Sequence, residues 1–138
     1  MATIRVVGPY DAKAHPGVIR KMITRSSSPV GNPFVIGVDG DRDTVCKRFE
    51  DLVWIDWEVH CEAPERVLDW IDKRVDEYKR GFDLELCCRC RPRALPDVPC
   101  HGDTLRDWIL WNAIDQREIK AQLCNSNRQQ IAESSCNC

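Results

Sequence analysis

The sequence lacks any long apolar run. Its stretches without a charged residue fall well short of the roughly 18 apolar residues that cross a membrane. The first residues, Met1 to Arg5, also contain no apolar signal core. We therefore expect a protein without a membrane partner that is soluble and resides in the cytoplasm.

The chain also has little net charge. Its 20 basic and 22 acidic side chains give a net charge of −2. Nucleic-acid-binding proteins usually carry a clear excess of positive charge, so this balance argues against nucleic acid as a dedicated partner. A local positive site for a small ligand remains compatible with it.

A complete set of disulfides within one chain is excluded, because the nine cysteines are an odd number. The missing signal core also argues against an oxidising compartment. A chain of 138 residues is the size of one ordinary domain. We expect a single α/β domain over residues 1–124 and a polar C-terminal tail over 125–138.

Short β-branched or alternating segments predict the strands. They cover residues 4–7, 18–24, 34–38 and 82–88, of which 34–38 is either a strand or an extended segment. In the last segment, apolar Leu84 and Leu86 alternate with Asp83 and Glu85, which is typical of a strand with one buried face.

Apolar residues at helical spacing predict helices over about 45–59, 64–80 and 104–123. We expect Asp43 or Thr44 to cap the first helix, Pro64 to begin the second and Asp103 to cap the third. Strands interleaved with helices predict an α/β fold with a small, partly parallel sheet packed by three main helices, Rossmann-like in type.

Ligands of such sheets bind beyond the carboxyl ends of the strands. After the strand at 82–88 the chain carries Cys88, Cys90, Cys100 and His101. Three thiolates and an imidazole suit zinc, or an iron–sulfur cluster. The spacing is unusual, because one residue separates Cys88 from Cys90, and adjacent Cys100 and His101 would need contorted backbone to reach one ion.

A second interpretation rests on the helix that we expect Asp103 to open. The start of a helix stabilises negative charge, so Cys100 and His101 lie where a thiolate or a bound anion is favoured. Nearby Arg89, Arg91 and Arg93 add positive charge. In an enzyme, Cys100 or His101 would be the nucleophile or general acid–base group, and Asp103 would orient His101. The alternative is that these residues only pack and cap the turn.

Two motifs carry a family resemblance. Gly31-Asn32-Pro33-Phe34, preceded by Arg25, is followed by Cys88-x-Cys90 and then by Cys100-His101-Gly102-Asp103. In this order they resemble the signature of a small uncharacterised domain family common in bacteriophages and bacteria. The resemblance implies a phage-type or bacterial cytoplasmic protein, within the bacterial host if phage-encoded, and it implies no established reaction.

If these two motifs meet in space, they form a pocket. Arg25, Gly31, Asn32, Phe34 and Gly102 would then bind a small anionic ligand: a nucleoside, a nucleotide or a nucleotide-sugar. Alternatively, Asn32 fixes its own loop by an Asx-type hydrogen bond. Our leading hypothesis is this ligand-binding protein, with or without a reaction on the ligand and with no cofactor or with zinc. The alternative is a cysteine-ligated zinc or iron–sulfur module with a structural or host-protein-binding role.

Overall fold

The computed structural model describes residues 2–8, 16–89 and 98–114. Three strands, β1 (Ile4–Val7), β2 (Val18–Met22) and β3 (Asp83–Cys87), form a parallel sheet with the order β1-β3-β2. The last of these strands is therefore inserted between the first two. The strands predicted at 4–7, 18–24 and 82–88 are confirmed, and the described sheet is parallel throughout.

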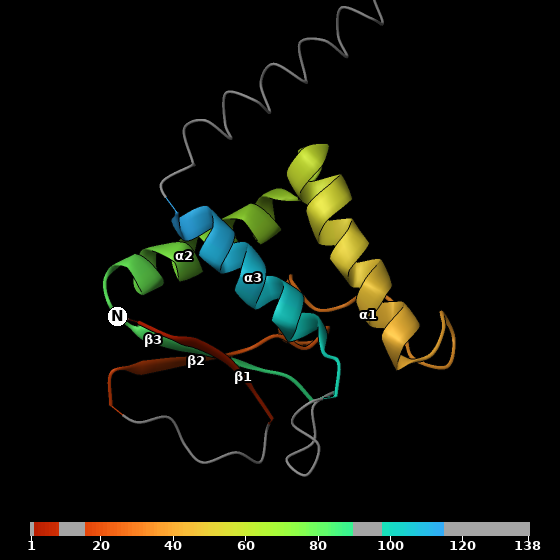
Figure 1. Cartoon of the computed structure of the whole chain (residues 1–138), viewed down its shortest axis with the longest axis horizontal. Helices are drawn as coiled ribbons and strands as arrows, with labels where there is room; N and C mark the ends of the chain where they lie inside the picture. Colours follow the sequence, from red (N-terminus) through yellow and green to blue (C-terminus); the bar gives the residue numbers. More distant parts are fainter. Residues whose placement is uncertain (1, 9–15, 90–97, 115–138) are drawn as a thin grey trace, which may run out of the picture.

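The helices lie on the same side of the sheet (Figure 1). Helix α1 (Arg42–Asp51) continues into the π-helix η1 (Leu52–Val59), and α2 (Glu65–Lys79) and α3 (His101–Ala113) follow. Helices α2 and α3 contact the strands, whereas α1 packs against α3. The predicted α/β class is confirmed, and the Rossmann-like type stays a prediction.

The central strand is buried on both faces, which corrects the prediction of a single buried face. Leu84 and Leu86 point into the core under the helices. On the opposite face, Glu85 is only 3% exposed. Its carboxylate pairs with Arg5 of β1 at 2.5 Å and with Arg20 of β2 at 3.1 Å. A central strand has a neighbour on each side, so two arginines in register can cover one carboxylate.

The segment 34–38 is not a strand. A single bridge joins Ile36 to Gly40, and the backbone turns between them. The Val35 N–H donates to the Asp39 carboxylate at 2.8 Å, and the Gly37 N–H donates to the Gly40 carbonyl at 2.8 Å. These local hydrogen bonds use the backbone groups that a sheet would need.

The first residues and the N-caps of the helices differ from those that the sequence patterns predict. Asp41 caps α1, and its carboxylate accepts a hydrogen bond from the Thr44 N–H at 2.8 Å. Pro64 is the N-cap of α2 and not its first residue. Cys100 caps α3, so the prediction that Asp103 does so is wrong. An apolar pattern marks the buried face of a helix, whereas the cap lies before that pattern and depends on local backbone geometry.

The aromatic residues join η1 to α3. Trp57 of η1 lies between Phe49 and Trp108, with ring centroids 6.0 and 5.7 Å away. Glu58 accepts hydrogen bonds from the indole N–H groups of Trp108 and Trp111 at 2.9 and 2.8 Å. Trp108 is fully buried, whereas Trp111 is 40% exposed.

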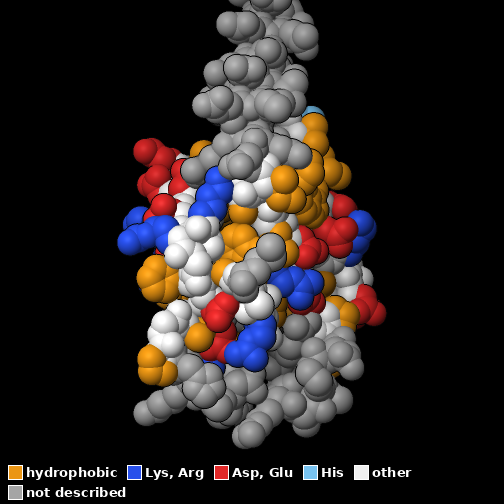
Figure 2. Space-filling view, turned by 60° about the vertical axis from the view of Figure 1, so that its left-hand side comes forward, with side chains coloured by type: hydrophobic (Ala, Val, Ile, Leu, Met, Phe, Trp, Pro, Cys, Tyr) orange, Lys and Arg blue, Asp and Glu red, His pale blue; other side chains and the backbone are white. Residues whose placement is uncertain are grey.

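Charged side chains of both signs are interspersed on the face shown in Figure 2. This mixture agrees with the small net charge of the chain. Among the described residues, no helix is both long and apolar enough to cross a membrane. Residues 115–123 of the third predicted helix and the predicted tail 125–138 lie outside the described residues. The domain boundary at 124 therefore stays a prediction.

Gly102 lets the start of α3 approach the sheet closely. A Cβ atom at this position would lie 2.8 Å from Val6 Cγ1 and 2.9 Å from Ile23 Cδ1. Real side chains do not approach so closely, so any larger residue would push α3 away from β1 and from the residue after β2.

We expect Gly102→Ala to lower the free energy of unfolding, measured by urea denaturation. Overpacking in a filled core costs about 1–3 kcal/mol, which exceeds the gain of up to about 1 kcal/mol from replacing glycine inside a helix. Val6→Ala provides the control, because it removes the two Val6 methyl groups that the new Cβ would meet and leaves only Ile23 Cδ1 in its way. If the double variant loses as much stability as the two single variants combined, the steric explanation is wrong.

Asp41 gives a pH-dependent contribution to stability. Hydrogen bonds from Thr44 lower the pKa of its carboxyl below the ordinary 3.8. A lowered pKa in the folded state stabilises the fold above the unfolded value, and this stabilisation disappears as the pH falls through the folded pKa. The Tm difference between the wild type and Asp41→Ala should therefore be largest near neutral pH and shrink below about pH 4. Asp43→Ala is the matched control, and a difference that is constant between pH 7 and pH 3 would contradict the assignment.

Candidate functional site

A cavity of about 400 Å³ lies beyond the carboxyl ends of β2 and β3. Its wall comes from the segments directly after these strands, from the loop around Phe34, from the start of α1 and from His101 at the start of α3. This is the edge of a parallel sheet at which ligands bind in α/β domains.

The cavity wall is positively charged. Arg25, Arg42 and Arg89 line it, and none of the described lining residues is acidic. Arg25 follows β2, Arg89 follows β3 and Arg42 begins α1, so three separate elements supply the charge. Guanidinium groups from several directions suit a phosphate or a carboxylate, which each can bind through two hydrogen bonds.

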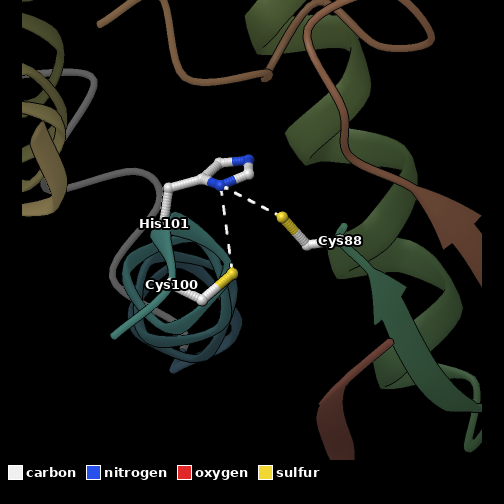
Figure 3. Close-up of side chains that lie close together, drawn as sticks. All are labelled: Cys88, Cys100 and His101. Atoms are coloured by element: carbon white, nitrogen blue, oxygen red, sulfur yellow. Dashed lines mark hydrogen bonds between the residues drawn. The ribbon is translucent and has the colours of Figure 1, made fainter. Parts of the chain in front are cut away.

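Cys88, Cys100 and His101 lie close together (Figure 3), and Cys88 and His101 also line this cavity. The His101 Nδ1 lies 3.5 Å from the Cys88 Sγ and 4.0 Å from the Cys100 Sγ, and the three ligand atoms all lie within 4.8 Å of one another. All three residues are at most 5% exposed. Zinc bonds of about 2.3 Å to sulfur and about 2.1 Å to nitrogen at tetrahedral angles would place a sulfur and a nitrogen ligand about 3.6 Å apart. The cluster could therefore hold a metal ion.

The hydrogen bond of the His101 Nε2 determines that its Nδ1 faces the two sulfurs. The Nε2 lies 2.8 Å from the carbonyl oxygen of Ile23. A carbonyl only accepts, so the Nε2 carries the proton and donates, and in the neutral ring the Nδ1 keeps its lone pair toward the sulfurs. Histidine ligands of metals typically donate their other ring N–H to such a carbonyl. Phe49 supports the ring edge-on, with centroids 5.2 Å apart.

Adjacent Cys100 and His101 reach the same point without strained backbone. Cys100 is the N-cap of α3 and is extended, with φ −142° and ψ 141°, whereas His101 is the first helical residue. The change from extended to helical backbone turns both side chains toward Cys88 (Figure 3). The expectation of contorted backbone was therefore wrong. The Gly102 N–H also donates to the Cys100 Sγ at 3.3 Å, which favours a thiolate there.

Gly31 positions Arg25 in the cavity wall. A Cβ at Gly31 would lie 2.2 Å from the Arg25 Cα and 2.4 Å from its backbone nitrogen. Only glycine allows two backbone segments to lie so close together. Gly31 itself does not line this cavity, so it contributes by holding the segment that carries Arg25.

Asn32 and Phe34 both line the cavity. The Asn32 Oδ1 accepts from the Phe34 N–H at 2.9 Å, which is the Asx-type hydrogen bond of the alternative interpretation. Its Nδ2 donates to the Val45 carbonyl of α1 at 3.1 Å. The amide therefore joins its own loop to α1 and shapes the cavity from there.

Cys100 and Asp103 line a second, smaller hollow of about 260 Å³, which shares Cys46 with the cavity. The ring of His101 is oriented by the Ile23 carbonyl, and the orienting role of Asp103 stays a prediction. Gly102 also has a different position from the predicted one, because it lies against β1 and not in the cavity wall. Cys90, the other predicted metal ligand, and Arg91 and Arg93 lie outside the described residues.

Sequence reasoning missed Arg42, Cys46 and the Ile23 carbonyl. Arg42 and Cys46 begin α1 and line the cavity. Identifying Asp41 as the helix cap would have placed Arg42 in the first turn, close to the loop that carries Asn32. The Ile23 carbonyl belongs to the backbone, so no residue type could reveal it.

The comparisons with known proteins give one match. The family model described as Domain of unknown function (DUF4326) covers residues 12–111, a range that includes every candidate site residue. No curated protein and no solved structure matches the chain significantly. The match spans well over half of the chain and agrees with the resemblance stated from the two motifs. The chain therefore belongs to the family Domain of unknown function (DUF4326).

Proposed function

We propose that this domain binds a small anionic ligand that carries a phosphate group, in the cavity beyond β2 and β3. The observation that carries the proposal is the convergence of Arg25, Arg42 and Arg89 on a cavity with no acidic residue among its described lining. Each of these arginines can form charge-assisted hydrogen bonds with a phosphate or a carboxylate bound in the cavity.

The size of the cavity favours a ligand of nucleotide class. Its volume of about 400 Å³ falls within the range of about 300–1,000 Å³ that is typical of small-molecule sites. The wall also has an apolar part, made by Phe34, Val35 and Ile36, which suits a base or a sugar face. Nucleotides and nucleotide-sugars combine these two chemical features, and a nucleoside alone would not use the arginines.

We expect phosphate, AMP and a nucleotide-sugar to bind the full chain in isothermal titration calorimetry, and Arg25→Gln to weaken the binding. A hydrogen bond to a charged group contributes about 1.5–3 kcal/mol, so the Kd should rise roughly 10- to 100-fold. Binding should also weaken as the salt concentration increases.

Arg80→Gln is the matched control for the loss of one positive charge. Arg80 caps the far end of α2, and its exposed side chain pairs with Asp76. This variant should keep the wild-type Kd. Equal losses in Arg25→Gln and Arg80→Gln would indicate a general charge effect, and the absence of binding by any of the three ligands would refute the proposal.

A second candidate function is zinc binding by Cys88, Cys100 and His101. The specific observation in its favour is the Nε2–H hydrogen bond to the Ile23 carbonyl, which directs the Nδ1 lone pair toward two sulfurs. Cysteine and histidine in such a set are ligands that zinc prefers. An iron–sulfur cluster is less favoured, because these clusters are usually held by four cysteines.

We expect the protein purified without chelators to contain a single zinc ion per chain by elemental analysis, and Cys88→Ser to lose it. Cys87→Ser is the matched control, because Cys87 is the preceding buried cysteine and lies outside the cluster. Circular dichroism should show that both variants fold. A folded wild-type protein that takes up no zinc, or equal loss of zinc from both variants, would rule out this site.

A further inference from the structure

The metal cluster and the arginine-lined cavity share two residues. Cys88 and His101 belong to the cavity wall, whereas Cys100 lines the smaller hollow. An ion held by these three side chains would therefore lie in the wall of the cavity itself. The proposed anion site and the proposed metal site would therefore adjoin each other.

Within the described part of the chain the cluster supplies three ligands, whereas zinc takes four. Structural zinc sites are closed by four protein ligands, whereas catalytic sites, including sites with two cysteines and one histidine, keep the fourth position for water or substrate. Cys88, Cys100 and His101 form such a three-ligand set among the described residues. Cys88 and His101 of this set border the cavity, so a ligand in the cavity lies next to an ion that the set would hold.

The charges at this place favour an anion as the fourth ligand. Two thiolates cancel the two positive charges of a zinc ion, and the imidazole is neutral. The three arginines then leave the surroundings positive. A third thiolate from Cys90 would close the site and make the metal centre negative, which would repel a phosphate.

We propose that the metal ion held by Cys88, Cys100 and His101 binds a phosphate oxygen of the ligand directly, in its fourth position. The metal and the arginines then hold the same phosphate group, and the remainder of the ligand lies along Phe34 and its neighbours. This inference rests on the anion binding and the zinc binding proposed above. It identifies the ligand as one whose terminal phosphate is exposed enough to coordinate a metal ion.

Cobalt(II) in place of zinc makes the coordination visible, because its absorption depends on the number and kind of its ligands. We would titrate the cobalt-loaded full chain with inorganic phosphate and follow both the visible d–d bands and the heat of binding. The bands should change saturably, with the same midpoint as in calorimetry. Arg25→Gln should raise this midpoint roughly 10-fold or more, and Arg80→Gln should leave it unchanged.

Cys90→Ser tests whether the site is open. If the fourth position belongs to the phosphate, this variant should keep the thiolate-to-cobalt absorption and the response to phosphate of the wild type. A clear fall in the intensity of that absorption, from three cobalt–sulfur bonds to two, would assign Cys90 as the fourth ligand and overturn the inference.

The remaining outcomes separate the inference from the proposals on which it rests. Phosphate that binds by calorimetry without changing the cobalt bands would overturn direct coordination and leave anion binding intact. No binding of phosphate to the metal-loaded protein by either measurement would overturn both. A protein that takes up neither cobalt nor zinc would overturn the inference together with the metal site, while calorimetry with the metal-free chain would still test anion binding.

Discussion

The candidate site depends on the close packing of the start of α3 against the sheet. Gly102 lies so close to Val6 and Ile23 that no side chain fits between them. The same approach places the His101 ring within 2.8 Å of the Ile23 carbonyl, which fixes its tautomer and its direction. Cys100, one residue earlier, is held as the helix cap. Two candidate ligands thus depend on one helix-to-sheet contact.

The sheet provides the third ligand and the arginines. Strand β3 lies in the centre, where Glu85 is held by arginines from both neighbours and Leu84 and Leu86 fill the core. A strand held on both sides gives Cys88, its next residue, a well-defined position. The ends of β2 and β3 also bring Arg25 and Arg89 to the same edge of the sheet. The parallel order of the strands therefore concentrates the chemistry of distant segments at one place.

Local sequence patterns predicted which helices and strands form better than they predicted the residue at which each one begins. Alternating or β-branched residues identified β1, β2 and β3, and apolar spacing identified the three helices, because these patterns reflect one buried side of each element. The segment 34–38 has the composition of a strand but closes on itself through Asp39 and Gly40. Asp103 resembles a helix cap by residue type, yet Cys100 has the extended backbone that a cap needs. Composition alone does not contain that backbone geometry.

The α/β class, the residue types at the site and the family follow from the amino-acid sequence, because hydrophobic periodicity and motif order are properties of the chain. The folded structure determines which of these residues meet. It brought Cys88 to Cys100 and His101, turned the Asn32 amide toward α1, and placed Arg42 in the cavity wall. The physical reason is that these contacts join segments far apart in the chain, and that the atom which orients His101 is a backbone carbonyl, which every residue possesses.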